Sequence, residues 1–360
     1  MVAIPSLSAP IRALSRWRPS LHGEGVLSAF ARMSDAVGAP IPRLVADFAA
    51  LALGPGRVAF ADYERLRLYD TAFWSKAYRR EVVGAARGRE LVRAANFRRD
   101  CQALAADRLA AGAYLAAHGL PTAPALAIYR AGLAAPGEAL LRSRGELRQF
   151  LQAHAGAPLT VRPAEGAASR TLFADGRDPA AQIDRLVDEV GDAPGLSWLI
   201  QPWLTPHPAI ARRTGGRAAP VQLVTLAGEA GARLFRALWR LGGRDDLVAS
   251  LDLRSGEALT LFPAKAPDRA QPAPAGLAVP DWARLKAAAC EGARLFGQFG
   301  LLGWEIAPTD AGPVIAAVDP APDLDLWQLA DRCGVLDPEL QGFLAARRRA
   351  RAEWRRAERL

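Results

Sequence analysis

The fold is decided by a segment near the C-terminus that runs Gly303-Trp304-Glu305-Ile306-Ala307, then Thr309-Asp310-Ala311-Gly312-Pro313, then Val314-Ile315-Ala316-Ala317-Val318-Asp319-Pro320. Two apolar runs joined by an Asp/Gly turn predict an antiparallel hairpin, with Glu305 roughly opposite Ala317 and Asp319. Carboxylates that face each other at the end of a buried hairpin are costly unless a cation lies between them. A hard ion such as Mg²⁺ is the usual solution. The alternative is that these acids merely end two strands in solvent, and the hairpin alone leaves both interpretations open.

The composition predicts a soluble protein with more than one packed unit. At 360 residues the chain is too long for one small core, and a hydrophobic content of 51% allows substantial burial. No apolar run reaches the about 18 to 20 residues that span a bilayer, because Pro, Gly or Arg interrupts each candidate. Residues 1–33 lack the apolar stretch and cleavage site of a secretory signal. We therefore expect a cytoplasmic protein without a membrane span.

Cysteine and charge narrow the function classes further. Cys101, Cys290 and Cys333 are far apart, which fits a reducing compartment and gives no metal-ligand spacing. The net charge of +9 raises a nucleic-acid interpretation, but only three of the 46 basic residues are lysines. An Arg-rich and Ala-rich chain indicates a general compositional preference before it indicates a binding surface. Nucleic-acid binding stays a second alternative, since no basic stretch is interleaved with aromatic side chains.

The pattern along the chain predicts an α+β fold with a helical N-terminal region. Residues 24–100 show helical spacing, with Tyr63, Tyr69, Phe73, Trp74 and Tyr78 expected in its core. Helices and strands then alternate, which favours an α/β or α+β sandwich. The expected helices are 100–117, 146–154 and 179–190, and the expected strands are 125–129, 159–162 and 198–201.

A second block of strands precedes the hairpin and completes the predicted organisation. Its strands are expected at 221–226, 233–240 and 247–253, followed by a Pro/Ala-rich connection at 263–280 and a helix at 282–299. The predicted units are 1–100 (helical region), 101–210 (small and central subdomains), 211–340 (C-terminal subdomain with the hairpin) and 341–360 (basic helical tail). We expect the tail to be a solvated helix, either an exposed end or an arm for a membrane or nucleic acid.

Several short motifs follow one another in a specific order. They are Asp107-Arg108, Gly119-Leu120-Pro121-Thr122-Ala123-Pro124, Val161-Arg162-Pro163 with Glu165-Gly166, Leu199-Ile200-Gln201-Pro202-Trp203-Leu204 with Pro206-His207-Pro208, Trp239-Arg240-Leu241-Gly242, and the hairpin. This order resembles the ATP-grasp superfamily, most closely its sugar-transfer-associated branch, related to alpha-L-glutamate ligase-like proteins. The resemblance covers residues 50–345. It implies an ATP-grasp fold, in which two α+β subdomains clamp a nucleotide.

The resemblance implies roles for the basic and glycine-containing motifs. Arg108 and Arg162 stand where the family has lysines on the ATP phosphates, and a guanidinium keeps the charge while changing the reach. Glu165 and Gly166 stand in the flap over the phosphates, where only one glycine remains. A plain surface loop is the alternative for that segment.

The remaining site residues follow from the same resemblance. Gln201 opens the adenine hinge, which ends at Leu204. Glu305 takes the first metal-ligand position and Asp319 the place of an asparagine, while Ala317 replaces a glutamate. Arg240 is the cation expected to stabilise a tetrahedral intermediate. His207 lies between two prolines, either as an ordinary loop histidine or as a catalytic one.

The function implied is that of an ATP-dependent carboxylate-amine ligase that uses ATP and Mg²⁺ and acts through an acyl phosphate. Its substrates would be a small-molecule carboxylate and an amine in glycan or peptide-like metabolite biosynthesis. Ala317, and Gln222 where the branch has an arginine, leave open whether the chain is active. The main alternative is a catalytically impaired relative that serves as a nucleotide-binding or metabolite-binding regulatory module. The sequence specifies neither the substrates nor the oligomeric state.

Overall fold

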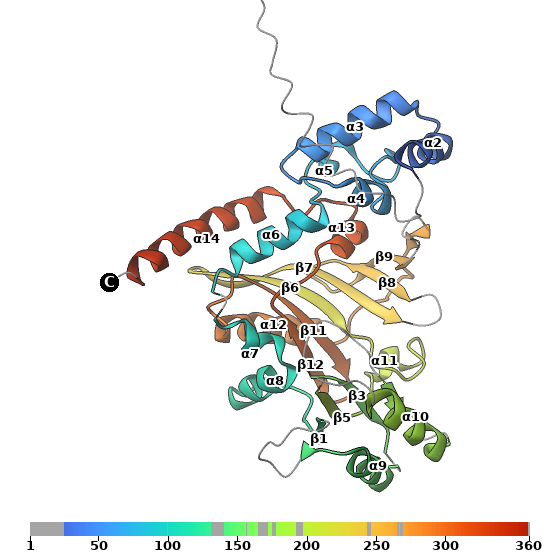
Figure 1. Cartoon of the computed structure of the whole chain (residues 1–360), viewed down its shortest axis with the longest axis vertical. Helices are drawn as coiled ribbons and strands as arrows, with labels where there is room; N and C mark the ends of the chain where they lie inside the picture. Colours follow the sequence, from blue (N-terminus) through green and yellow to red (C-terminus); the bar gives the residue numbers. More distant parts are fainter. Residues whose placement is uncertain are drawn as a thin grey trace, which may run out of the picture.

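The computed structural model describes residues 25–98, 100–130, 140–155, 157–164, 172–174, 178–191, 197–242, 246–264, 266 and 269–358. These residues form a helical N-terminal region, a five-stranded sheet and a seven-stranded sheet. Figure 1 shows the N-terminal helices above the large sheet and the small sheet below it. The prediction of an α+β fold with a helical N-terminal region is therefore confirmed.

The N-terminal helices pack around a cluster of aromatic side chains. They are α2 (Val26–Val37), α3 (Ile41–Leu53), α4 (Phe60–Arg65) and α5 (Lys76–Arg79). Tyr63 and Trp74 are fully buried, as expected, but Tyr78 is 50% exposed because the short helix α5 turns it toward solvent. Among the described helices, none alone has the length and hydropathy to cross a membrane, and α2 with α3 meets that test only as a pair bent by 108°.

The small sheet has the strand order β2-β1-β5-β3-β4. Its strands are β1 (Ala127–Tyr129), β2 (Leu140–Leu141), β3 (Leu159–Pro163), β4 (Leu172–Ala174) and β5 (Trp198–Pro202). Helices α9 (Arg144–Ala153) and α10 (Pro179–Gly191) cover the face that carries Val161 and Ile200. Because side chains alternate along a strand, Arg162 and Gln201 lie on the opposite face, which turns toward the large sheet.

The large sheet has the strand order β10-β9-β8-β7-β6-β11-β12. Its strands are β6 (Val221–Gly228), β7 (Gly231–Gly242), β8 (Leu247–Leu251), β9 (Ala258–Pro263), β10 (Gln271–Pro272), β11 (Leu301–Thr309) and β12 (Gly312–Asp319). The segment expected as a plain connection, 263–280, contributes the edge strand β10, which pairs with β9. The short helix α11 (Pro208–Ala211) follows the small sheet and precedes β6.

Helices cover both faces of the large sheet. On one face, α12 (Trp282–Leu295) packs with α7 (Gln102–Ala106) and α8 (Arg108–Ala117) over a core that includes Trp239 and Trp304. On the other face lie α6 (Ala85–Ala95), α13 (Asp325–Asp331) and α14 (Pro338–Ala357). This second cover is incomplete near β11 and β12, where a cavity opens on the sheet.

The helix expected over residues 100–117 is in fact two helices. Asp107 has an extended backbone (φ −87°, ψ 113°) and ends α7. Its side chain accepts hydrogen bonds from Leu109 N at 2.8 Å and Ala110 N at 3.0 Å, so it caps α8. The prediction of one continuous helix was wrong because an Asp with this capping geometry competes with the interior of a helix. The break places Arg108 at the first position of α8.

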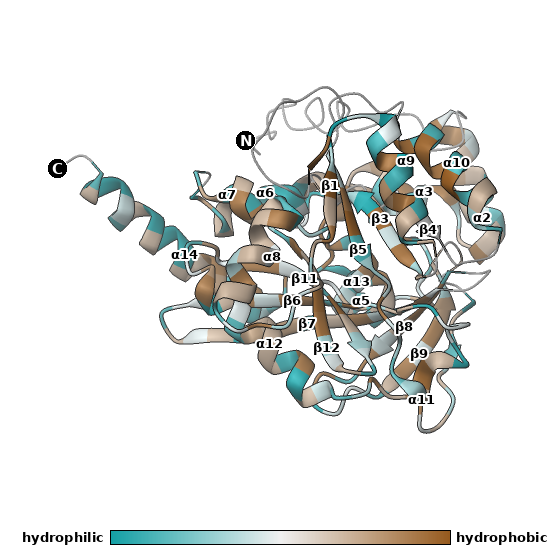
Figure 2. Ribbon diagram, turned by 90° about the horizontal axis from the view of Figure 1, so that it is seen from below, coloured by the Kyte–Doolittle hydropathy of each residue, from teal (hydrophilic) through white to brown (hydrophobic). Residues whose placement is uncertain are grey.

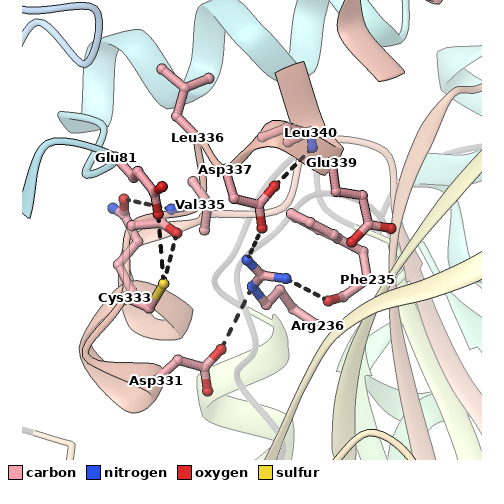
Figure 3. Close-up of polar contacts among 12 residues, drawn as sticks. Glu81, Phe235, Arg236, Asp331, Cys333, Val335, Leu336, Asp337, Glu339 and Leu340 are labelled. Atoms are coloured by element: carbon pink, nitrogen blue, oxygen red, sulfur yellow. Dashed lines mark hydrogen bonds and ion pairs between the residues drawn. The ribbon is translucent and has the colours of Figure 1, made fainter. Parts of the chain in front are cut away.

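Polar contacts attach the C-terminal helices to the rest of the molecule. Gln328 on α13 is fully buried, accepts from Val83 N at 2.8 Å and donates to Val83 O at 3.0 Å. Arg236 on β7 lies between two carboxylates, with Asp337 Oδ2 at 2.6 Å and Asp331 Oδ2 at 3.6 Å (Figure 3). Asp337 also caps α14 by accepting from Leu340 N at 2.8 Å. These contacts fix α13 beside the cavity.

The basic C-terminal segment is only partly solvated. Its helix begins at Pro338, so the expected boundary at residue 341 falls inside α14. Phe343 and Leu344 are buried, and Arg347 donates from Nε to Ala95 O at 2.9 Å and from Nη2 to Gln298 O at 3.2 Å. The expectation of a solvated helix was therefore wrong for its first turns, whose apolar side chains complete the core under α6. Figure 2 shows the rest of α14 extending away from the body.

The hairpin forms with the predicted register. Glu305 pairs with Ala317, and Gly303 pairs with Asp319. The register shifts between Glu305 and Ile306, which pairs with Ile315, so Ala316 is the extra residue of a β-bulge. The turn is closed by Thr309 Oγ1, which donates to Gly312 O at 2.5 Å, and Gly312 takes a positive φ of 107° that glycine tolerates.

Candidate functional site

A cavity of about 200 Å³ lies where β11 and β12 leave the cover of α13. Its lining includes Arg108, Gln222, Glu305, Ala317, Asp319 and Trp327. Pockets that enclose a whole small ligand usually measure about 300 to 1,000 Å³. This cavity therefore suits the charged end of a larger ligand. It also collects, from distant parts of the sequence, the acids and one of the cations that the motifs predicted.

The two carboxylates share one face of the sheet. Glu305 is directly opposite Ala317, and Ala317 and Asp319 are alternate residues of β12, so all three point to the same side. Gly303 lies opposite Asp319, and a Cβ at Gly303 would come within 3.1 Å of the Asp319 Cβ. Asp319 Oδ1 accepts from Ala321 N at 2.8 Å, which holds the carboxylate at the end of the strand. A side chain at position 303 would therefore crowd Asp319.

The Asp319 carboxylate is destabilised as a free anion. Burial raises the pKa of Asp319 above its usual value, and the Glu305 carboxylate raises it further. The Ala321 N–H and the Arg108 guanidinium oppose this rise. A bound cation would relieve both the burial cost and the repulsion between the acids. The electrostatics of this pair therefore favour a cation at the cavity.

The small sheet contributes Arg162 to the same place. Its Nε donates to Gln201 Oε1 at 2.9 Å, and its Nη2 donates to Ala316 O at 2.6 Å. Ala316 is the bulge residue, so its carbonyl is available to a donor outside the ladder. Arg162 thereby connects β3 of the small sheet with β12 of the large sheet. Burial lowers the pKa of Arg162 to about 10, Arg108 contributes to the decrease, and Glu305 opposes it.

Arg108 is held at the end of the same strand. Its backbone N–H donates to Ala164 O at 2.8 Å, and its Nη1 donates to Pro163 O at 2.8 Å. The capping of α8 by Asp107 sets the direction in which this side chain leaves the helix. Two guanidinium groups that repel each other, next to two carboxylates, make neighbouring sites for an anion and a cation. A metal-bound polyphosphate has both charges.

The side chain of Gln201 is held by contacts within the protein, and its place at the start of the adenine hinge stays a prediction. It is 5% exposed, accepts from Arg162, and donates from Nε2 to Ala123 O at 2.9 Å. These contacts make it a positioning residue for Arg162. Leu204 is half-buried just after β5. The predicted flap residues Glu165 and Gly166 lie outside the described residues.

Arg240 and His207 do not line the cavity. Arg240 follows Leu238 by two residues on β7, and Leu238 pairs with Gln222, so Arg240 shares the sheet face of the cavity. Its Nη2 contacts Asp246 Oδ2 at 2.7 Å. The catalytic role of Arg240 stays a prediction. His207 Nδ1 accepts from Ala209 N at 3.2 Å and so caps the short helix α11.

The sequence reasoning missed Trp327. This residue is 5% exposed and lines the cavity from α13, and its Nε1 is buried without a hydrogen-bond partner among the described residues. Sequence offered no signal for it, because the position of α13 depends on contacts with Val83 and Arg65, which lie more than 200 residues earlier. A buried indole N–H usually finds a hydrogen-bond partner, so this one is an exception within the described residues.

The donor set fits Mg²⁺ and phosphate oxygens. No group of three or more His, Cys, Asp or Glu side chains suited to a metal occurs within the described ranges. Glu305 and Asp319 place two carboxylates at the cavity, and Mg²⁺ commonly completes its shell with water and substrate phosphates. Arg108 and Arg162 supply the donors that phosphate requires. These four side chains are suited to a metal ion that is already bound to an anion such as a polyphosphate.

Comparisons with known proteins find similar solved structures but no close relative in sequence. No family model matches the sequence, and no curated protein matches it. Solved structures that match include a D-alanine-D-alanine ligase from Coxiella burnetii, with 11% identity, a TM-score of 0.43, and coverage of 71% of this chain and 62% of that one. The D-cycloserine synthetase DcsG matches with 20% identity, a TM-score of 0.40 and coverage of 68% and 70%.

A third match is the D-alanine-D-alanine ligase from Bacillus anthracis in complex with ATP, with 12% identity, a TM-score of 0.41 and coverage of 69% and 67%. The chain thus spans less than two thirds of the Coxiella enzyme. Identities and TM-scores this low leave the function to be argued from the residues of this chain.

Proposed function

We propose that the chain is an ATP-binding protein of ATP-grasp type that holds MgATP between its two sheets. Arg108 and Arg162 bind the phosphates, and Glu305 and Asp319 bind the metal. The observation that carries the proposal is the convergence of these four side chains, in which Arg162 reaches from β3 to Ala316 O on β12. The order of motifs in the sequence, which resembles the ATP-grasp superfamily, supports the same conclusion.

The reaction that suits this arrangement is carboxylate-amine ligation. An oxygen of the substrate carboxylate attacks the γ-phosphorus, ADP leaves, and the amine nitrogen of the second substrate then displaces phosphate from the acyl carbon. Arg108 and Arg162 would hold the transferred phosphoryl group through charge-assisted hydrogen bonds. Mg²⁺, when bound, would neutralise charge on the phosphate oxygens. Arg240 remains the candidate for stabilising the tetrahedral intermediate.

A specific observation favours a second candidate, a nucleotide-binding or metabolite-binding regulatory module. Ala317, directly opposite Glu305, offers no third carboxylate on that face. Gln222 also lines the cavity with an uncharged side chain. Binding needs only the two cations and two acids, whereas turnover needs the metal held firmly. The two candidates therefore share the site and differ in the rate of phosphoryl transfer.

Calorimetric titration of ATP, with and without Mg²⁺, tests the shared site. Release of ADP in the presence of paired carboxylates and amines, from amino acids, peptides and sugar acids, then separates the two candidates. Binding with ADP release supports the ligase, and binding without it supports the regulatory module. Absence of ATP binding at millimolar nucleotide contradicts the ligase and the nucleotide-binding form of the regulatory module. Ala317→Glu should tighten Mg²⁺ binding and raise any ADP release, with Asp310→Glu in the exposed turn as its control.

A further inference from the structure

The helical N-terminal region contains a second cavity, larger than the first. It has a volume of about 420 Å³ and lies between the C-terminal end of α3, the loop 54–56 and α5. Its walls are mostly apolar, from Ala50, Leu51, Pro55 and Val82. The volume falls within the range of about 300 to 1,000 Å³ in which small ligands are usually bound. No residue of this cavity lines the cavity at Glu305.

A close backbone approach builds the floor of this second cavity. Gly56 is buried against the segment that carries Val82, and a Cβ at Gly56 would lie 1.9 Å from Val82 O. Gly84 N donates to Gly56 O at 2.9 Å and closes the contact. Only glycine fits at position 56, so the loop and Val82 form a fixed wall.

Charge gives this cavity a preference for anions. Three cations line it, namely Lys76, Arg79 and Arg80, against one acid, Asp47. Lys76 and Arg80 are exposed, whereas Arg79 is 6% exposed and belongs to the interior of the cavity. After Arg79 and Asp47 neutralise each other, two positive charges remain at the rim. An apolar cavity with a cationic rim suits a ligand that has an apolar body and an anionic head.

Arg79 also has a buried donor that the protein does not satisfy. Its Nη2 contacts Asp47 Oδ1, which fixes the guanidinium. Its Nε is buried and has no hydrogen-bond partner among the described residues. A buried donor without a partner costs about 1 to 3 kcal/mol, and more when it is charged. An oxygen atom of a ligand in the cavity would remove that cost.

We propose that this cavity is a binding site for a small organic oxyanion, a carboxylate or a phosphate monoester on an apolar body. The head group takes hydrogen bonds from Arg79 and charge from Lys76 and Arg80. The apolar body lies against Ala50 and Val82. The site is independent of the proposed nucleotide site and does not depend on its being correct.

The test uses the full chain and two anionic probes of similar size, benzoate and phenyl phosphate, with neutral benzamide for comparison. Isothermal titration calorimetry measures each affinity. We expect at least one anion to bind at least about tenfold more tightly than benzamide, a difference of about 1.4 kcal/mol. Whichever anion binds more tightly identifies the head group as carboxylate or phosphate.

Two variants locate the binding. Ala50→Phe fills the cavity without a change of charge, and Ala46→Phe, one turn earlier on the exposed surface of α3, is its control. Lys76→Glu with Arg80→Glu reverses the rim charge, and Arg43→Glu, exposed on α3 outside the cavity, is its control. We expect both cavity variants to weaken the anion at least about tenfold and both controls to leave it within about twofold.

The remaining outcomes contradict the proposal. Absence of binding for both anions would overturn it, as would equal affinity for benzamide. An anion that loses its affinity in Arg162→Ala but keeps it in Ala50→Phe would show that the probe binds at the other cavity. Because Arg162 and Ala50 line different parts of the molecule, failure here leaves the proposed nucleotide site untouched.

Discussion

Arg162 contacts both sheets, since it donates to Gln201 in the small sheet and to Ala316 O in the large one. If it also binds phosphate, Arg162→Ala should weaken ATP about tenfold or more, the ~1.5 to 3 kcal/mol of a charge-assisted hydrogen bond. Calorimetry of the folded variant measures this loss. Arg162→Lys should recover part of the affinity because the charge remains.

The matched control for Arg162 is Arg148→Ala on α9, whose side chain is 47% exposed and pairs with Asp184. ATP affinity should be unchanged in that variant. Equal affinity in wild type and in folded Arg162→Ala would refute the phosphate assignment, whatever its effect on the contact between the sheets.

We expect the Asp319 carboxylate to lower the free energy of unfolding at neutral pH and to contribute to Mg²⁺ binding. Its folded pKa is raised, so the folded protein holds the proton more tightly than the unfolded chain. The associated stability is present below the unfolded pKa and is lost as the pH rises through the folded pKa. Asp319→Asn, which keeps the acceptor for Ala321 N, should therefore raise the free energy of unfolding at pH 7 while weakening Mg²⁺ binding.

Urea unfolding at pH 7 and a Mg²⁺ titration in the presence of ATP measure the two effects of Asp319→Asn. Asp310→Asn in the exposed hairpin turn should change neither. A variant that is less stable at pH 7 than wild type would show that the carboxylate forms stabilising contacts which the burial argument omits.

The residues of the site were predictable only where local pattern determined their positions. Glu305 and Asp319 followed from the hairpin, because a tight turn fixes the register and alternation fixes the face. The bulge at Ala316 was not predictable, and neither was its contact with Arg162, which joins residues 154 positions apart. Trp327 was missed because tertiary contacts alone bring α13 over the cavity.

At the scale of elements, α14 shows how an Arg-rich helix can still be part of the core. Leu344 is 4% exposed, and Arg347 donates to Ala95 O and Gln298 O. A chain that ends at Phe343 loses both and should lose about 2 to 4 kcal/mol of unfolding free energy. This differs from the sequence-based expectation that the segment after residue 341 is a solvated helix.

Thermal and urea unfolding of two truncated chains test the role of α14. A chain that ends at Trp354 keeps the contact of Trp354 with Phe97, whose ring centroids are 5.7 Å apart, and should retain wild-type stability. If the chain that ends at Phe343 is equally stable, Leu344 and the hydrogen bonds of Arg347 contribute nothing to the free energy of unfolding, contrary to their burial and contacts in the fold.

A comparison of the predicted and observed helices and strands shows which sequence patterns were reliable. Eight of the described strands, β1, β3, β5, β6, β7, β8, β11 and β12, were predicted from apolar runs and lie within a few residues of the expected ranges, whereas β2, β4 and β9 were not predicted. The helix 100–117 was mispredicted because the helix-forming residues on both sides of Asp107 masked its capping signal. The strand β10 was missed because Pro272 lies in it, and proline is tolerated only at a sheet edge.

Across the whole molecule, a partly buried ion pair connects the N-terminal region to α13. Arg65 Nη2 contacts Asp325 Oδ2 at 2.5 Å and Asp62 Oδ1 at 3.0 Å. Burial raises the pKa of Asp325 to about 6, Asp323 adds to the rise, and Arg65 opposes it. The stability that Asp325 contributes is therefore present below about pH 4 and is lost as the pH rises to about 6.

Asp325→Asn removes this dependence while Asp62 still pairs with Arg65. The difference in unfolding free energy between variant and wild type should be small at pH 4. At pH 7 the variant should be more stable than wild type by about 1 to 3 kcal/mol. Urea unfolding at both pH values measures the gain, and Asp184→Asn, 64% exposed on α10, serves as the control. A gain of the same size at pH 4 would contradict the assigned pKa.

The whole architecture was predictable as a class. Alternating helices and strands indicated an α+β fold, and the motifs assigned a nucleotide site to the region between its parts. How the two sheets approach each other was not predictable, since it rests on Arg162, on Ala316 and on the parallel bridge between Thr122 and Ile315. Such contacts depend on the folded shape of both sheets at once.

A crystal structure with Mg²⁺ and a non-hydrolysable ATP analogue would show whether one MgATP molecule is bound by both sheets. We expect phosphate oxygens within hydrogen-bond distance of Arg108 and Arg162. We also expect a Mg²⁺ ion within about 2.1 Å of an oxygen of Glu305 or Asp319. A nucleotide bound elsewhere, or bound at this cavity with neither carboxylate near the metal, would refute the proposed MgATP site.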